Sequence, residues 1–167
     1  MKGILRKEKE IRNRSKMIKI LQDTKYITIA MCDKEEPYLV TLSHGYDSAR
    51  NVIYFHCADE GRKIEVLKKN NTVWGQAIHD KGYVPGECNQ LYETTQFHGK
   101  VTFIKDIQEK KFALVTMIKQ LEENPENVIK KQITDESIKR VNIGRIDLDL
   151  MTAKKSIKPL INEVSNS

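Results

Sequence analysis

One segment, residues 53–67, constrains the fold more than any other part of the chain. A β-prone apolar run is followed by a short polar turn and then by a helix pattern that opens with Arg62 and Lys63. The first backbone N–H groups of a helix have no partner within the helix, and the helix dipole is positive there. This helix start is therefore a candidate anion site, in which Arg62 offers a planar fork and Lys63 a point charge to a phosphate. The alternative is a strand-to-helix connection whose charges face water, and Asp59 and Glu60 weaken the electrostatic case for an anion.

Composition limits the class of protein. The 167 residues are 39% hydrophobic and 31% charged, which is typical of a soluble globular chain long enough for one domain with its own core. No apolar run approaches the roughly 18 residues of a membrane span, and no apolar stretch follows the basic start as it would in a signal peptide. Three widely spaced cysteines without a C-x-x-C pattern indicate neither a disulfide framework nor a structural zinc site. We therefore expect a protein of the reducing cytoplasm, with no membrane partner and no metal.

The net charge of +6 raises the question of a nucleic-acid ligand. The cations, however, alternate with acids, as in residues 6–10, 109–111 and 119–123. Mixed-sign patterns of this kind are typical of solvated helix faces. We therefore expect no nucleic-acid partner.

The hydrophobic pattern changes between helical and β periods along the chain. Capping residues at Asp106 and Asn124 open two helices in the second half of the chain. The other expected elements are helices over 8–22 and 61–70, strands over 26–32, 38–44, 52–56, 72–78, 91–105 and 141–150, and a glycine- and proline-bearing loop over 79–90.

These elements predict a small antiparallel barrel with peripheral helices, of the α+β class and mainly β. The strands at 38–44 and 52–56 are close enough in sequence to form a hairpin. In the last strand the apolar positions slip by one residue at Gly144, which predicts a β-bulge. We expect a single domain over residues 1–167, in which 1–22 form an N-terminal helical arm and 156–167 a C-terminal tail.

Side chains suited to catalysis or metal binding are sparse. The histidines show no paired-ligand spacing, and no Walker or G-x-G-x-x-G loop is present. A Cys–His nucleophile pair is disfavoured at Cys57, because the neighbouring His56 points to the opposite face of the strand. Aromatic and short polar residues do gather on the strands around the Arg62-Lys63 turn, where together they would line a slot for a flat, phosphate-bearing ring. These residues are Tyr38, Thr41, Ser43, Tyr54, His56, Trp74 and Gln76.

Three consecutive motifs resemble those of a known family. They are Pro37–Leu42, Ile53–Ala58 and Glu60–Lys63, and a strand over Tyr92–Gly99 follows them downstream. Over about residues 5–155 the pattern resembles the FMN-binding split-barrel superfamily, and within it the nitroimidazole-resistance (Nim-type) branch related to pyridoxamine 5′-phosphate oxidases. The resemblance implies a six-stranded antiparallel split β-barrel with peripheral helices. It also implies FMN as the cofactor and a homodimer with the flavin at the subunit interface.

The resemblance further implies which residues contact the cofactor. Arg62 and Lys63 would clamp the FMN phosphate, with His56 beside it, and Thr94 or Thr95 would approach from a long strand of this or the partner subunit. His56 and His98 are the candidate acid–base residues, because histidine exchanges protons near neutral pH. The remaining expected cofactor contacts are Thr41, Leu42 and Ser43 along the isoalloxazine edge, together with Phe55 and Gln76.

The function implied is electron transfer from reduced flavin to a small organic acceptor, of which a nitro-aromatic compound is one example. The vitamin B6 reaction is not expected, because the C-terminal residues that hold the substrate phosphate in true pyridoxamine-phosphate oxidases have no match here. One alternative is a flavin- or haem-binding carrier without turnover, with His44 or His56 as an iron ligand. Another is a colourless regulatory domain that has lost the cofactor, against which the Arg62-Lys63 pair argues.

Overall fold

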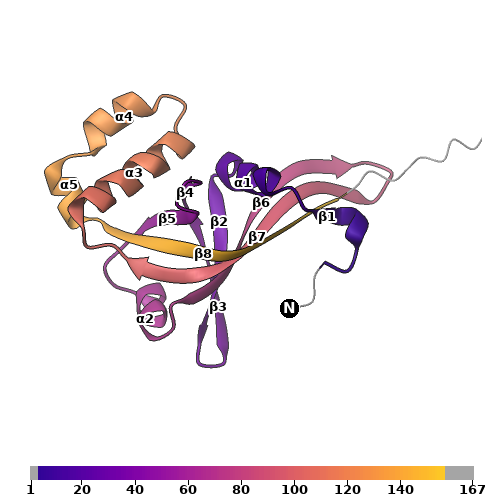
Figure 1. Ribbon diagram of the computed structural model, residues 1–167, viewed down its shortest axis with the longest axis horizontal. Helices are drawn as coiled ribbons and strands as arrows, with labels where there is room; N and C mark the ends of the chain where they lie inside the picture. The colour runs from indigo at the N-terminus through magenta and orange to yellow at the C-terminus, as the bar shows by residue number, and fades with distance from the viewer. Residues whose placement is uncertain (1–3, 157–167) are drawn as a thin grey trace, which may run out of the picture.

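The computed structural model describes residues 4–156, and Figure 1 shows a strongly bent antiparallel sheet with helices around it. As predicted, the fold is α+β and mainly β. The strands are β1 (Glu10–Ile11), β2 (Tyr26–Asp33), β3 (Glu36–Ser43), β4 (Gly45–Asp47), β5 (Val52–Cys57), β6 (Thr72–Val84), β7 (Asn89–Phe103) and β8 (Asn142–Lys155). The helices are a 3-10 turn (Lys7–Lys9), α1 (Arg14–Asp23), α2 (Arg62–Lys69), α3 (Ile107–Leu121), α4 (Pro125–Gln132) and α5 (Asp135–Arg140).

The strand order explains why the sheet curls into a split barrel. Neighbours follow the path β3-β2-β6-β7-β8-β5-β4, with the short β1 paired to β8. The two ends of this path, β3 and β4, are consecutive in the chain and are joined through His44. The chain therefore brings the two edges of the sheet together, but no ladder links β3 to β4 or β5 within residues 4–156. The barrel is open along this line, and the six longer strands β2, β3, β5, β6, β7 and β8 form its wall.

Two predictions about the hairpins need correction. The strand expected over residues 38–44 pairs with β2, from Asp33↔Glu36 to Tyr26↔Ser43, and the hairpin with β5 is made by the separate strand β4. The expected loop over 79–90 is mostly strand, because β6 runs to Val84 and β7 begins at Asn89. A register shift between Asp80 and Tyr83 absorbs the local irregularity that the sequence pattern presents as a loop.

The N-terminal arm is helical over a shorter stretch than predicted. Helix α1 begins at Arg14, where the Asn13 side chain accepts a hydrogen bond from the Lys16 backbone N–H at 3.1 Å. Before it, β1 adds a short strand to β8. Of the predicted C-terminal tail, Ser156 hydrogen-bonds to the backbone of Tyr92, and the rest lies outside the described residues.

Strand β8 contributes residues to two cores. Ile146 belongs to the core inside the barrel, whereas Ile143 belongs to a second core between the sheet and α3. The ladder from β8 to β5 passes Gly144 without a register shift, and the ladder to β7 reaches Gly144 in register, so the predicted bulge there is wrong. The apolar pattern slips because the strand contributes to two cores. Gly144 is required for a different reason: a Cβ at this position would overlap the ring of Phe55.

The helices cover some faces of the sheet and leave another open. Helices α3, α4 and α5 lie together beside β4 and β5, α1 lies over the β6–β7–β8 region, and α2 follows β5 (Figure 1). The face of β2, β3, β6, β7 and β8 directed away from the barrel core carries two adjacent cross-strand rows, which the register defines. One row is polar: Thr41, Thr28, Gln76, Gln96 and Thr152. The other is Leu39, Ala30, Trp74, His98 and Leu150.

Candidate functional site

The N-terminus of α2 lacks an internal cap. Its cap residue is Gly61, which has a φ of 116° and no side chain to accept a hydrogen bond. The carbonyl of Gly61 accepts from the N–H groups of Ile64 and Glu65, at 2.9 and 3.1 Å. No such backbone bond engages the N–H groups of Arg62 and Lys63 within the described chain. These donors and the positive end of the helix dipole are therefore available to an anion.

The two predicted cations of this turn lie over aromatic rings. The Arg62 guanidinium is 4.6 Å from the centroid of the Tyr38 ring, and the Lys63 ammonium is 5.7 Å from that of Phe55. The nearest carboxylate to Arg62 is that of Glu36, at 3.5 Å, and its side chain is 81% exposed. An ion pair this long and this exposed contributes little. Both charges are thus held in position while most of their hydrogen-bonding capacity is unused.

Strand β3 lies beside this turn and has an unpaired edge. Within residues 4–156 its ladder is with β2 alone, so backbone groups on its other side have no sheet partner. Thr41 lies on the outer face, where its hydroxyl is 3.1 Å from that of Thr28. Leu42 alternates to the inner side and packs against the barrel core. The edge therefore offers backbone donors and acceptors near an apolar strip, as the resemblance implies for residues 41–43.

Two shallow hollows lie on the outer face of the sheet. One, of about 350 Å³, is lined by Ile78, Tyr92, Thr94 and Lys154 with Gln76, Asp80 and Gln90. The other, of about 260 Å³, is lined by Trp74, Gln96, Leu39 and Thr28 with Ala30, Gly75 and Gln76. Gln76 borders both. The predicted site residues therefore fall into two groups, one around β3, β5 and α2 and the other on β6 and β7.

Two predicted contacts are not brought to these surfaces. Thr95 is fully buried and donates its hydroxyl to the Met17 carbonyl at 3.0 Å. Its neighbour Thr94 lines the hollow of about 350 Å³, but only 3% of it is exposed and its hydroxyl donates to the Ala77 carbonyl at 2.8 Å. Strand alternation places His56 on the side of β5 opposite Phe55. His56 is exposed and stands away from the ring that Lys63 covers.

The buried histidine and the half-buried cysteine have structural explanations. His44 Nε2 is 2.9 Å from the Leu21 carbonyl oxygen, and burial lowers the pKa of this imidazole, so it stays neutral where the chain turns from β3 to β4. Burial raises the pKa of the Cys57 thiol, against the opposing effect of Lys63, so the thiol is not activated as a nucleophile. Among residues 4–156 no three His, Cys, Asp or Glu side chains form a group that could hold a metal.

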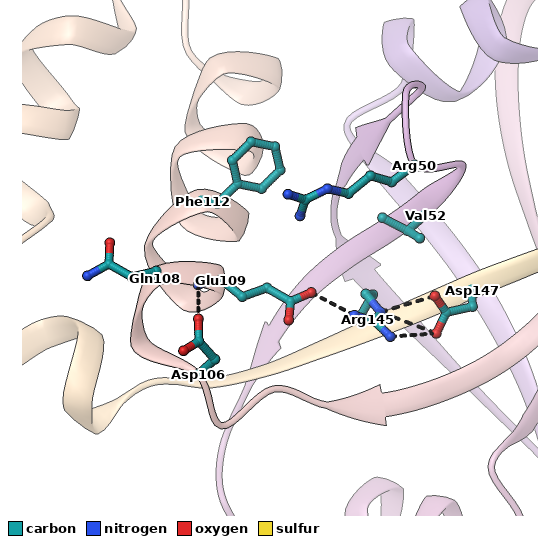
Figure 2. A pocket seen from close by; sticks show the side chains of 8 residues that line it. All are labelled: Arg50, Val52, Asp106, Gln108, Glu109, Phe112, Arg145 and Asp147. Atoms are coloured by element: carbon teal, nitrogen blue, oxygen red, sulfur yellow. Dashed lines mark hydrogen bonds and ion pairs between the residues drawn. The ribbon is translucent and has the colours of Figure 1, made fainter.

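A larger hollow, of about 640 Å³, lies elsewhere and is lined by none of the predicted site residues. Figure 2 shows it between the first turns of α3 and strands β5 and β8. Arg145 donates to Glu109 at 2.7 Å and to Asp147 at 3.2 Å. The hydrogen bond to Glu109 raises the pKa of Arg145, and the bond to Asp147 adds to this effect. The Arg50 guanidinium lies 4.4 Å from the centroid of the Phe112 ring. The charges in this hollow neutralise one another and tie α3 to the sheet.

A histidine–carboxylate pair on the outer face was only half predicted. His98 Nδ1 is 2.6 Å from Asp149 Oδ1, and the His98 and Trp74 ring centroids are 5.0 Å apart. The sequence singles out His98 but gives no sign of Asp149, which is 51 residues away along the chain. The two strands meet at a register shift that no local pattern encodes.

Comparison with known proteins identifies the family of this chain. The pattern of the pyridoxamine 5′-phosphate oxidase family matches residues 13–155, nearly the whole described chain. The chain belongs to this family. Membership confirms the resemblance drawn from the three motifs and the split barrel that it implied. Among curated proteins, none matches this chain.

Solved structures similar to this family member include three that are informative. A candidate 5-nitroimidazole antibiotic resistance protein from Bacteroides thetaiotaomicron is 26% identical, with a TM-score of 0.75 over 87% of this chain and 86% of that one. The flavocytochrome Anf3 from Azotobacter vinelandii is 14% identical, with a TM-score of 0.74 over 90% and 70%. A FAD-binding protein from Mesorhizobium loti is 17% identical, with a TM-score of 0.63 over 87% and 96%. The last two likenesses show the shared fold. No helix in residues 4–156 is long and apolar enough to span a membrane.

Proposed function

We propose that this protein binds FMN and, as a homodimer, passes electrons from the reduced flavin to a small organic acceptor, of which a nitro-aromatic compound is the leading example. Family membership and the likeness to a candidate 5-nitroimidazole resistance protein support the proposal. Similar structures described as a flavocytochrome and a FAD-binding protein support a flavin in general. The free thiols Cys32, Cys57 and Cys88 fit the reducing cytoplasm expected from the sequence.

The observation that carries the proposal is the uncapped first turn of α2. Free backbone N–H groups, the helix dipole and two cations converge there, and within residues 4–156 the only ion pair at this turn is the exposed one from Arg62 to Glu36 at 3.5 Å. A phosphate would meet charge-assisted donors from Arg62 and Lys63 and from the backbone beside Gly61. The unpaired edge of β3 would then follow the flat ring system with the backbone of Thr41, Leu42 and Ser43.

The chain's own residues would bind, orient and shield the cofactor. When bound, flavin supplies the redox chemistry. Phe55, beneath Lys63, gives the site an apolar floor. Gln76 and Thr94 lie on the other group of strands and would contact the flavin of the partner subunit, whereas Thr95, which is bonded to Met17, takes no part.

The exposed outer face supports the homodimer. Leu39 and Ile78 are 64% and 51% exposed, and each lines one of the two hollows that Gln76 borders. Tyr26, which is 62% exposed, lies on the same strand as Thr28, two residues before it. Exposed apolar residues clustered on one sheet face are typical of a protein–protein contact. A two-fold assembly is the commonest way for identical chains to cover such a face. It would also bring the two groups of predicted flavin contacts together.

The test compares FMN binding by the native protein, Arg62→Ala and Lys63→Ala. Each substitution removes a charge-assisted contact of roughly 1.5–3 kcal/mol, so the FMN dissociation constant is expected to rise by about one to two powers of ten. Lys68→Ala, at the exposed last turn of the same helix, is the matched control and is expected to bind as the native protein does. Riboflavin, which lacks the phosphate, should be indifferent to all three substitutions.

Four results would contradict the proposal. Native affinity in both first-turn variants would place the phosphate elsewhere. A purified protein with a Soret band in place of the twin flavin bands would support the haem alternative, and a colourless one that does not take up FMN would support the cofactor-free alternative. Light scattering tests the assembly, because a monomer of about 19.4 kDa with flavin still bound would refute the homodimer.

A further inference from the structure

The pair formed by His98 and Asp149 is built by an irregularity in the sheet. The β7–β8 ladder runs from Glu93↔Lys155 to His98↔Leu150 and then resumes at Gly99↔Leu148. Asp149 is therefore an extra residue on β8, and this bulge places its carboxylate 2.6 Å from His98 Nδ1. Gly99 is part of the same construction, because a Cβ there would overlap the backbone oxygen of Asp147.

The hydrogen bond assigns the two ring nitrogens different tasks. A carboxylate accepts only, so Nδ1 carries a proton and donates it to Asp149. Nε2 is then the nitrogen that can exchange a proton, and within residues 4–156 the structure gives it no hydrogen-bond partner. Trp74 packs against the ring at 5.0 Å between centroids, which restricts its rotation. The side chain of His98 keeps 25% of its surface exposed, so Nε2 is not shut off from a ligand.

The pair lies next to a residue expected to contact the flavin. In the register, Gln76 faces Gln96, and Trp74 faces His98. Gln76 and His98 are thus diagonal cross-strand neighbours, which are about 7–8 Å apart in a sheet. Trp74, Gln76 and Gln96 also line the hollow of about 260 Å³ beside the pair. A ring held against Gln76 would bring an acceptor within reach of His98.

We propose that His98 is the proton donor to the acceptor reduced at this site and that Asp149 is its positioning residue. The inference rests on the proposed function. Reduction of a nitro group to a nitroso group takes up two electrons and two protons and releases one water. Reduced flavin, when bound, supplies a hydride equivalent, which accounts for both electrons and one proton. His98 takes up a second proton from solvent on Nε2 and, as the imidazolium, gives that proton to the departing oxygen; the N–O bond breaks, and the ring returns to the neutral form with its proton on Nδ1.

The experiment uses the flavin-loaded dimer and three variants. His98→Gln keeps a partner for Asp149 but cannot supply the proton, Asp149→Asn removes the positioning carboxylate, and Lys100→Gln alters an exposed residue two positions further along β7 as the control.

Pre-reduced protein is mixed with a 5-nitroimidazole, which needs protons, or with ferricyanide, which takes one electron and no proton. Reoxidation by the nitro compound is expected to slow about a hundredfold in His98→Gln and about tenfold in Asp149→Asn. Ferricyanide rates and flavin content should stay within about twofold of the native protein, as should every rate of the control.

A spectroscopic measurement separates positioning from a merely structural role. Nitrogen-15 shifts of the His98 ring in the oxidised native protein are expected to place the proton on Nδ1, and Asp149→Asn is expected to give a mixture of tautomers. A native ring with its proton on Nε2 would overturn the inference. So would a His98→Gln variant that keeps the native nitro rate, or one that slows equally with both acceptors. A native protein without flavin, or one whose reduced flavin ignores the nitro compound, overturns the proposed function and this inference with it.

Discussion

Two sets of cations lie around β5, and they differ in what holds them. On the neighbouring strand β8, in the hollow of Figure 2, Arg145 is bonded to Glu109 at 2.7 Å and to Asp147 at 3.2 Å. After β5, Arg62 has a single exposed carboxylate at 3.5 Å, and Lys63 lies over an aromatic ring. The first set is neutralised within the chain. The second is positioned and left free to bind.

The comparison shows that the size of a hollow is a poor guide to function in this molecule. The hollow of about 640 Å³ is the larger, yet its charges are already paired. The turn at Gly61 offers backbone N–H groups without an acceptor in the described chain. We therefore expect substitutions around Arg145 to change folding stability and substitutions around Arg62 to change ligand affinity.

The largest stability effect is expected for Arg145→Met. The variant leaves Glu109 and Asp147 facing each other without their shared cation, and the Arg145 and Glu109 side chains are only 30% and 25% exposed. The expected loss in the free energy of unfolding is about 2 kcal/mol, which lies between the values for exposed and for fully buried ion pairs. It corresponds to a fall of about 4–8 °C in melting temperature. Calorimetry of the apo-protein measures it, with Lys68→Ala as the control. An unchanged melting temperature together with weakened FMN binding would show that Arg145 serves ligand binding and not folding stability.

A smaller effect is expected at a third cluster of paired charges. Burial would raise the pKa of Glu93, but hydrogen bonds from Lys16 and Lys81, at 2.5 and 2.8 Å, lower it overall. Because the folded pKa lies below the unfolded value of 4.5, the stabilisation is complete above about pH 4.5 and is lost as pH falls through the folded pKa. Glu93→Gln should therefore reduce the loss of stability between pH 7 and pH 3 by about 1 kcal/mol. Urea unfolding across this pH range tests it, and an identical pH profile in Glu93→Gln and native protein would count against the assignment. Exposed Glu87→Gln is the control.

The smallest effect is expected for a substitution beside the α2 turn. Glu36→Gln removes the carboxylate nearest to Arg62. A phosphate would then meet less competition, so FMN affinity is expected to rise by about two- to threefold at low salt. Titration of FMN fluorescence measures the change, with the adjacent exposed Glu35→Gln for comparison. Weaker binding in Glu36→Gln would mean that this carboxylate belongs to the site and is not a competitor.

The sequence predicted the features that depend on neighbouring residues. Helix α2 and the Asp106 cap of α3 follow from local patterns, and the structure has the cap, with Asp106 accepting from the Glu109 N–H at 2.7 Å. The motifs around Arg62 also identified the family, because their spacing lies within one strand–turn–helix unit. These features needed no information about which strands pair.

The features that depend on pairing were missed or misplaced. The slip at Gly144 was predicted to be a bulge because one sequence cannot show that β8 serves two cores. The true irregularity at Asp149 appears only once β7 is aligned with β8. Thr94 and Thr95 are equivalent in sequence, and only the orientation of the strand places one outside and the other under α1. Long-range register is what residue patterns fail to supply.

Gly61 has a consequence for the empty protein. Ser, Thr, Asp or Asn at a helix start would satisfy the free N–H groups from within the chain, at a gain of about 1 kcal/mol. Gly61 cannot, and its φ of 116° would strain any residue with a Cβ. An anion bound at the turn would therefore accept the hydrogen bonds that the side chain of a capping residue accepts in other helices. The first turn of α2 is then expected to fray when no anion is bound and to become ordered when one binds. The order of this turn would therefore report whether the site is occupied.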